Sequence, residues 1–182
     1  KRISDRIRQK RLTHTIGVLE TACALSERFG GDLFAVSRAA IYHDLFKGVQ
    51  KSELLELGYA LGYEVTDPVE ALPEIAHGPI AALWLEQEGI LSDALILNAI
   101  RYHTVGRRDM TLEEKIVYLA DAIEPGRDYP GVAPLRMLAL ESLDRALLFS
   151  VSQTLQFVLA TGSMIHPNSV EMRNALLQSL EK

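Results

Sequence analysis

The chain has 182 residues, of which 48% are hydrophobic and 24% are charged, and its formal net charge is -5 at pH 7. These values are typical of one folded domain spanning residues 1–182, and they disfavour global disorder and a general nucleic-acid-binding surface. The single cysteine, Cys23, excludes an internal disulfide, and no apolar run is long enough to cross a bilayer, so we expect a reducing, cytoplasmic setting.

Apolar residues recur at spacings of three and four along most of the chain, which predicts α-helices rather than strands. The first such segment runs from Leu12 to Phe29, and the following Gly30-Gly31 is a typical helix end. Asp32 is a suitable N-cap for a second helix that reaches His43. The sequence therefore begins with a predicted pair of helices joined by a short turn.

The middle of the chain has weaker helix signals. A short helix is predicted over 52–57, followed by a loop that reaches Asp67. The stretch 67–70 contains the cap, the proline and the acid that begin a helix, but Pro73 limits that helix to about one turn. A further helix is predicted from near Pro79 to Glu88.

Four more helices complete the prediction. Ser92 is expected to cap the first of them, and the capping box 111–114 opens the next. A long helix is predicted over 134–161, and a last one from Asn168 to the end of the chain. The expected fold is all-α: a single compact helical bundle of roughly eight to ten helices.

Four polar side chains interrupt the apolar faces of these helices: His14, His43, Asp44 and Asp121. Each has a simple structural explanation when taken alone, such as a hydrogen-bonded core histidine, or Asp121 paired with Arg127. Burying a carboxylate is nevertheless costly unless it meets a cation or several hydrogen-bond donors. Because these four residues lie on three separate apolar stretches, they indicate convergence on one ion.

Longer motifs accompany these residues and extend over nearly the whole chain. They are Arg11-Leu12-Thr13-His14, His43-Asp44-Leu45-Phe46-Lys47, His77-Gly78, His103-Thr104-Val105-Gly106, Ala120-Asp121-Ala122-Ile123-Glu124-Pro125-Gly126-Arg127 and Ile165-His166-Pro167. The chain resembles the HD-domain phosphohydrolases, and more narrowly the YqeK family of symmetrical bis(5'-nucleosyl)-tetraphosphatases. Val105 departs from that pattern, which has a second threonine there.

The resemblance implies an HD-domain helical bundle and a role for individual residues. The implied metal ligands are His14, His43, Asp44 and Asp121, and the implied cofactor is iron, as one or two ions, with manganese or another divalent cation as the alternative. The side chains implied to surround the nucleotide phosphates are Arg11, Lys47, His77, His103, Thr104 and Arg127. The residues implied to contact the nucleoside are Ser163, Met164, Ile165, His166, Pro167 and Asn168.

The implied reaction is the symmetrical cleavage of diadenosine tetraphosphate into two ADP, by attack of a metal-bound hydroxide on an inner phosphate. Imidazoles and carboxylates suit iron or manganese, and such an ion supplies hydroxide near neutral pH. If two ions bind, Asp44 is the natural bridge between them. The residues expected to act in catalysis are His77, His103 and Lys47, and either histidine can serve as the general acid.

Other functions remain open at this point. One is an HD phosphohydrolase that acts on a nucleoside monophosphate or triphosphate, another is a paired-iron oxygenase, and a third is a non-catalytic metal-containing sensor or interaction domain. The expected partner is a small-molecule nucleotide, with no nucleic acid and no membrane. A homodimer is compatible with the long apolar helix near the C-terminus, which fits a core or a dimer face equally well.

Overall fold

The structure is a computed structural model that describes residues 9–181, and within that range it contains ten α-helices and no strand. The first half of the chain forms α1 (Gln9–Phe29), α2 (Leu33–Tyr42), α3 (Lys51–Ala60), α4 (Asp67–Ala71), the 3₁₀ helix η2 (Pro73–Ala76) and α5 (His77–Gln87). The second half forms α6 (Ala94–Tyr102), α7 (Leu112–Ile123), α8 (Val132–Glu141), α9 (Leu143–Ala160) and α10 (Pro167–Leu180). The all-α prediction of eight to ten helices is confirmed.

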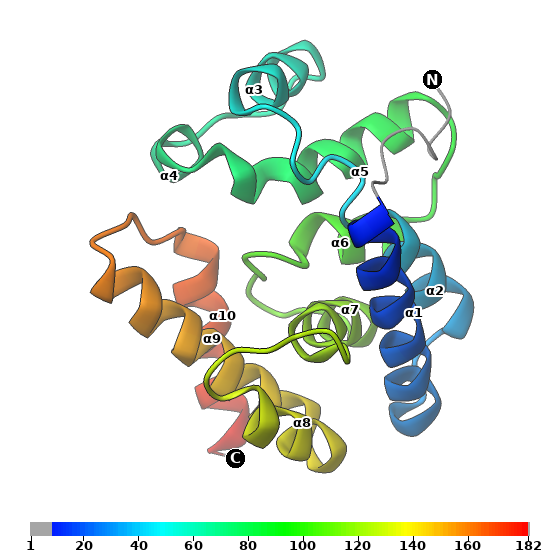
Figure 1. Ribbon diagram of the computed structural model, residues 1–182, viewed down its shortest axis with the longest axis vertical. Helices are drawn as coiled ribbons and strands as arrows, with labels where there is room; N and C mark the ends of the chain where they lie inside the picture. Colours follow the sequence, from blue (N-terminus) through cyan, green and yellow to red (C-terminus); the bar gives the residue numbers. More distant parts are fainter. Residues whose placement is uncertain (1–8, 182) are drawn as a thin grey trace.

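Helix α7 lies in the middle of the bundle and packs against α1, α2, α6, α8 and α9 (Figure 1). Its sequence explains this position, because Ile116, Val117, Leu119 and Ala120 are all buried and the helix is therefore apolar around most of its circumference. Asp121 follows this stretch directly. The central helix therefore carries a carboxylate into the interior of the fold.

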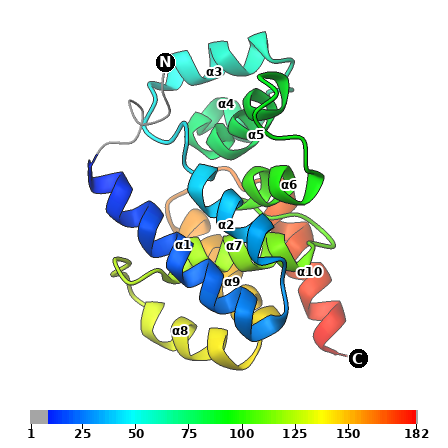
Figure 2. The same ribbon diagram turned by 90° about the vertical axis from the view of Figure 1, so that its right-hand side faces the viewer.

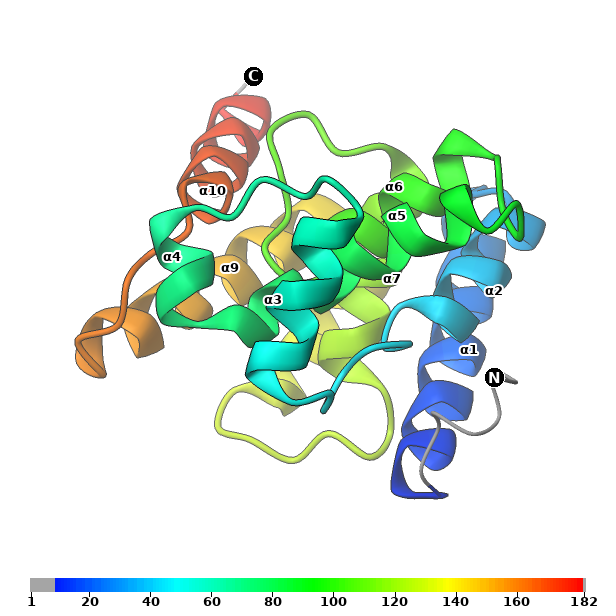
Figure 3. The same ribbon diagram turned by 90° about the horizontal axis from the view of Figure 1, so that it is seen from above.

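The other helices surround α7 on two sides and at one end. Helices α1 and α2 lie on one side of it, while α9 and α10 lie on the other (Figures 1 and 3). Helices α3, α4 and α5 form a layer at the end opposite α8 (Figure 2), and α5 packs on α6. The ends of α2, η2 and α6 therefore face one another beneath this layer, where the histidine motifs of the sequence lie.

Most helix ends follow the expected capping residues, with one correction. Asp32 and Thr111 cap α2 and α7 through their side chains, as predicted. The predicted cap at Ser92 is wrong, because Asp93 accepts the hydrogen bond from the Leu95 amide at 2.8 Å. An aspartate directly before the first helical residue is the better placed acceptor.

The start of two helices differs from the prediction by one or two residues. Helix α5 begins at His77 and not near Pro79. The helix accepts Pro79 within its first turn, because the N–H that proline lacks would have no partner within the helix there. Thr66, not Asp67, occupies the N-cap position of α4. The earlier start of α5 makes His77 the first residue of that helix.

The single long helix predicted over 134–161 is wrong, because the chain breaks it into α8 and α9. Ser142 is in an extended conformation (φ -157, ψ 121), and its hydroxyl accepts a hydrogen bond from the Arg145 amide at 3.4 Å, which caps α9. The apolar spacing continues through this position without a glycine or proline, so the only local signal for the break is Ser142 itself, an N-cap residue type followed by Asp144 in the first turn of α9. The separation of α8 from α9 lets α9 pack independently against α7 and α10.

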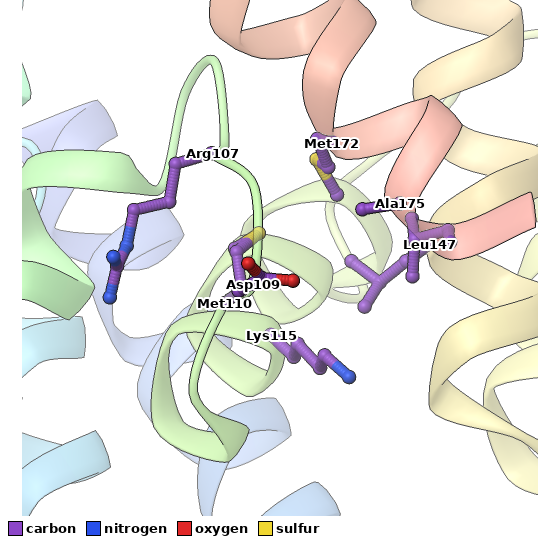
Figure 4. A pocket seen from close by; sticks show the side chains of 8 residues that line it. Arg107, Asp109, Met110, Lys115, Leu147, Met172 and Ala175 are labelled. Atoms are coloured by element: carbon purple, nitrogen blue, oxygen red, sulfur yellow. The ribbon is translucent and has the colours of Figure 1, made fainter. Parts of the chain in front are cut away.

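A small cavity of about 70 Å³ lies between the turn after α6 and helices α7, α9 and α10 (Figure 4). The charged side chains at its edge are paired: Arg107 forms two hydrogen bonds to the fully buried Glu114, at 2.7 and 2.8 Å, and Lys115 contacts Asp144 at 2.7 Å. This arrangement holds the turn that directly follows the His103-Thr104 motif.

Candidate metal centre

The four predicted metal ligands meet in space, although they come from three helices. His14 extends from α1, Asp121 from α7, and His43 and Asp44 from the end of α2. The Nε2 atom of His14 lies 3.1 Å from Oδ1 of Asp121 and 3.7 Å from Oδ2 of Asp44, and the Nε2 atom of His43 lies 3.8 Å from Oδ1 of Asp44. The fold therefore brings two imidazoles and two carboxylates to one point.

Two further histidines belong to the same cluster. The Nε2 atom of His77 lies 3.0 Å from Oδ1 of Asp44 and 3.0 Å from Nε2 of His103. Two groups of candidate ligand atoms, each with its atoms within 4.8 Å of one another, share His43: one contains His14, His43 and Asp121, and the other contains His43, Asp44 and His103. We call these six residues the histidine–aspartate cluster: His14, His43, Asp44, His77, His103 and Asp121.

Three of the four imidazoles are oriented in the same way. Each has its Nδ1 atom hydrogen-bonded to the carbonyl oxygen of the residue three positions earlier, at the end of a helix or within η2. The pairs are His43 with Ala40 at 2.7 Å, His77 with Glu74 at 2.6 Å, and His103 with Ile100 at 2.7 Å. Because a carbonyl only accepts, Nδ1 carries the proton, and the Nε2 lone pair of the neutral ring faces the cluster.

The fourth imidazole, His14, is held by a carboxylate that the sequence analysis did not select. Its Nδ1 lies 3.1 Å from Oε1 of Glu124, whose other oxygen accepts a hydrogen bond from the Gly126 amide at 2.6 Å. Glu124 is buried, and a Cβ at position 17 would lie 2.6 Å from its Oε2 atom, so Gly17 leaves the space that Glu124 occupies. A carboxylate behind a histidine is the usual orienting partner of a metal ligand.

The arrangement of these donor atoms fits a divalent cation. The Nε2 atoms of His14 and His43 are 3.3 Å apart, so their lone pairs repel unless a proton or cation lies between neighbouring donors. Oδ1 of Asp44 is buried without a well-directed hydrogen bond, and the Nε2 atom of His77 lies 3.0 Å from it. Imidazole nitrogens and carboxylate oxygens without a thiolate are typical ligands of iron, manganese and similar ions.

The electrostatics of the cluster support the same conclusion. Burial alone would raise the pKa of Asp44 and of Asp121, but the surrounding imidazoles, with Lys47 beside Asp44 and Arg127 beside Asp121, hold both pKa values below the usual range. Burial lowers the pKa of His43 and of His103, so both rings are neutral near pH 7. The cluster therefore combines ionised carboxylates with unprotonated imidazole nitrogens, which is the state that binds metal.

The predicted cations lie at the edge of the cluster. Arg11 donates a hydrogen bond to Oδ2 of Asp44 at 3.2 Å, and the Lys47 ammonium lies 3.9 Å from Oδ1 of the same carboxylate. Arg127 donates to the backbone carbonyl of Asp121 at 2.7 Å and pairs with its carboxylate. All three side chains are about one third exposed, so they can also reach an anion in solvent.

The residues predicted to contact the nucleoside lie farther along the chain. They occupy the loop after α9 and the first residues of α10, and Asn168 donates to the Gly106 carbonyl at 3.3 Å. This bond attaches the segment to the turn that follows His103 and Thr104, whose hydroxyl lies 3.1 Å from Nε2 of His103. Val105, the departure from the family pattern, is buried. The nucleoside-binding role of 163–168 remains a prediction.

A pocket of about 710 Å³ opens beside the cluster, and His103, Thr104 and Asp121 form part of its wall. The rest of the wall comes from α7, from residues 129–130 and from one face of α9. The sequence did not single out these residues, because a half-exposed tyrosine or glutamine on a helix is an ordinary surface residue.

None of the helices in residues 9–181 combines the length and the hydropathy needed to cross a bilayer.

Comparison with known proteins shows which family the chain resembles. The model of the HD domain family matches residues 11–126. A protein of Bacillus subtilis (strain 168) named "Bis(5'-nucleosyl)-tetraphosphatase, symmetrical" is 38% identical over 96% of this chain and 94% of its own length. A protein of the same name from Halalkalibacterium halodurans is 37% identical over 96% of this chain and 93% of its own.

A solved structure has the same fold. The crystal structure of a protein from Clostridium acetobutylicum, described as a predicted HD superfamily hydrolase involved in NAD metabolism, superposes with a TM-score of 0.92. It is 36% identical in sequence and covers 96% of this chain and 93% of its own. The family match and the full-length relatives confirm the resemblance read from the sequence motifs. The chain therefore belongs to the HD domain family and, within it, to the family of the symmetrical bis(5'-nucleosyl)-tetraphosphatases.

Proposed function

We propose that this protein hydrolyses diadenosine tetraphosphate symmetrically into two ADP, with the histidine–aspartate cluster as its metal-dependent reaction centre. The observation that carries the proposal is the convergence of four imidazole nitrogens and two carboxylates beside a pocket of about 710 Å³, whose wall includes His103 and Asp121 of the cluster. Pockets of that volume accept nucleotide-sized ligands. The names of the full-length relatives select this substrate and this bond among the nucleotides that such a pocket accepts.

The ligand assignment forms part of the proposal. His14, His43, Asp44 and Asp121 would hold one ion, and His77 and His103 would be available to a second ion beside Asp44. We propose iron as the native metal, with manganese as the alternative from the same donor set. A bound divalent ion lowers the pKa of a coordinated water and offsets the charge that develops on the phosphoryl oxygens.

The basic residues act on the substrate phosphates. Arg127 has a planar fork that can hold two oxygens of one phosphate, while Lys47 and Arg11 supply single charges beside Asp44. Together they offset the mismatch between a polyanionic substrate and a chain of net charge -5. Thr104 contributes a hydroxyl beside His103, and Ser163, Met164, Ile165, His166, Pro167 and Asn168 contact one nucleoside.

The catalytic roles can be narrowed from the geometry. His77 and His103 direct their Nε2 lone pairs at the cluster, and burial lowers the pKa of His103. Both features favour a role as metal ligand over that of a proton donor. The Lys47 ammonium is about one third exposed and has three donor hydrogens, so we assign it to the leaving phosphate.

The test is product analysis by chromatography. The full chain is loaded with ferrous or manganous ion and incubated with diadenosine tetraphosphate, with a chelator-treated sample and Asp44→Asn as controls. ADP should be the sole nucleotide product, and both controls should be inactive. AMP together with ATP would contradict symmetrical cleavage. Faster turnover of a nucleoside monophosphate, a triphosphate or NAD, in the same substrate panel, would assign the site to another nucleotide.

A further inference from the structure

One wall of the 710 Å³ pocket beside the cluster contains none of the proposed metal ligands. Helix α9 and the segment between α7 and α8, which passes beside α9 in Figure 1, form this wall. The aromatic and amide side chains on it are Tyr118, Tyr129, Gln153, Gln156 and Phe157. None of residues 163–168 lines the pocket, so this wall is distinct from the segment assigned to a nucleoside above.

Aromatic rings provide flat surfaces in this pocket. The Tyr129 hydroxyl donates to the Ala122 carbonyl at 2.8 Å, which fixes the ring and leaves it half-exposed. Phe157 is 68% exposed although it is the bulkiest apolar side chain on this face of α9. Nucleic-acid bases stack on rings of this kind whatever hydrogen-bonding groups the base carries on its edge. The two rings therefore suit a planar heterocycle at the mouth of the pocket.

Two amides lie next to the rings. Gln153 and Gln156 are three residues apart, so they share one face of α9, and neither forms a hydrogen bond within the described part of the chain. Gly131, at φ +98, leaves room for the Gln153 amide, with which a Cβ at that position would collide. A glutamine amide offers one acceptor and two donor hydrogens, which complements the N6 and N7 atoms of adenine.

The geometry of a symmetrical substrate requires two such positions. Cleavage in the middle of a tetraphosphate places the reacting phosphorus between two nucleosides, each separated from it by at least one other phosphate. The cluster contributes Asp121 and His103 to the pocket wall, so a polyphosphate held at the cluster can extend into this pocket. One nucleoside assigned to 163–168 leaves the second without a site.

We propose that this pocket binds one of the two adenosine groups of the substrate, with Phe157 and Tyr129 stacking on the base and Gln153 and Gln156 bonding to its edge. The inference rests on the proposed function for the identity of the ligand. It adds residues that determine nucleotide affinity and are separate from the metal centre.

The experiment uses the full-length, metal-loaded protein and two side chains that are exposed enough to be replaced without loss of folding. Affinities for ADP, for a methylene-bridged analogue of diadenosine tetraphosphate and for tripolyphosphate are measured by calorimetry for Phe157→Ala, Gln156→Ala and a control, Leu159→Ala. Leu159 lies on the same helix, is 67% exposed and does not line the pocket. Melting temperatures verify that all three variants are folded.

Phe157→Ala should weaken the affinity for the analogue by about fivefold or more, as expected for the loss of one stacked base. Gln156→Ala should weaken it less, and Leu159→Ala should match the wild type. Tripolyphosphate affinity should be equal in all four proteins, because the cluster is intact. In turnover, the Michaelis constant should rise while kcat stays within about twofold.

Wild-type affinity of Phe157→Ala and Gln156→Ala for the analogue would overturn the inference, as would an equal loss of tripolyphosphate affinity. Failure of the wild type to bind the analogue would overturn it too. A different result separates the two proposals: if the wild type does not cleave diadenosine tetraphosphate but Phe157→Ala weakens ADP binding, the proposed function fails and the nucleotide pocket stands.

Discussion

The histidine–aspartate cluster and the wall of α9 meet at one pocket, to which the cluster contributes His103 and Asp121, but they are built in opposite ways. In the cluster, six side chains from separate parts of the chain are largely buried, and every imidazole is fixed through Nδ1. On the α9 wall, Gln156 and Phe157 are exposed neighbours on a single helix. The cluster is suited to fix the position of reacting groups, and the wall is suited to adapt to a ligand.

This contrast has an energetic basis. A buried charge that loses its partner is costly, so each member of the cluster depends on the others. An exposed side chain that loses a ligand contact costs only that contact. Substitutions in the cluster should therefore change metal content, catalysis and stability together, whereas substitutions on the wall should change affinity for the nucleotide alone.

The largest effect is expected for the carboxylates of the cluster. Asp44→Asn and Asp121→Asn each remove a charge from the proposed ligand set while keeping the side-chain shape. We expect metal content to fall and turnover to drop by more than about 100-fold, because even indirect partners of metal ligands are worth that much. Elemental analysis and steady-state kinetics check both quantities. Full metal content and full activity in both variants would refute the ligand assignment.

Glu124 should have the next largest effect, although it does not face the substrate. Glu124→Ala frees the His14 ring from its buried partner, so metal affinity should fall by about 10–100-fold. Competition with a coloured chelator measures this affinity. The control is Glu113→Ala, which removes a partly exposed glutamate of α7 that lies outside the cluster, and it should leave metal affinity unchanged. Equal metal affinity in Glu124→Ala and the wild type would reduce Glu124 to a packing role.

Arg127 lies between the two regions, since it contacts Asp121 and is also partly exposed. Arg127→Ala should lower kcat/KM by about tenfold or more through the loss of charge-assisted hydrogen bonds. Arg127→Lys should recover only part of the loss, because lysine lacks the planar fork. Wild-type kinetics in Arg127→Ala would mean that Arg127 is a surface cation and does not bind the substrate phosphates.

The smallest effect is a pH dependence that only the cluster should show. Burial holds the pKa of His43 and of His103 below its ordinary value of 6.5, so the unfolded chain binds more protons than the folded chain as the pH falls below about 6.5. Stability supplied by these neutral rings is therefore lost on acidification. The pKa of His14 is raised, mainly by its hydrogen bond to Asp121, so this ring gains stability on acidification and opposes the loss. Because two rings have lowered pKa values and only one has a raised value, we expect a net loss.

Thermal melting in chelator should accordingly show Tm falling between pH 7.5 and pH 5. His103→Asn should have a shallower slope, because one buried ring no longer has to remain neutral, and Phe157→Ala should keep the wild-type slope. A Tm that rises toward pH 5 in the wild type would mean that His14 outweighs the two buried rings, and it would contradict this part of the account.

The two regions also differ in how far the sequence predicts them. His14, Asp44 and Asp121 were selected from the sequence because a charged or polar group on an apolar helix face contradicts the hydrophobic pattern. Gln156 and Phe157 contradict nothing, because exposed glutamine and single exposed aromatic residues are ordinary on a helix. Glu124 was missed as a site residue for a different reason: its partner His14 is 110 positions away in the chain, so no local pattern connects the two.

The fold shows the same division between local and tertiary information. Caps such as Asp32 and Thr111 were predicted because their residue types act within one turn of the helix. The break at Ser142 was not, because the apolar spacing passes through it without a glycine or proline. The break depends on how α8 and α9 each pack against α7, which is tertiary information.

The central claim is that water attacks an inner phosphorus at the cluster. Its most direct test is turnover of diadenosine tetraphosphate in water enriched in ¹⁸O, with mass spectrometry of the products. We predict ADP as the sole nucleotide product, with one labelled and one unlabelled ADP per turnover and the label on the terminal phosphate, and no labelled product from Asp44→Asn. Label in AMP, or label on the α-phosphate of ADP, would contradict the claim.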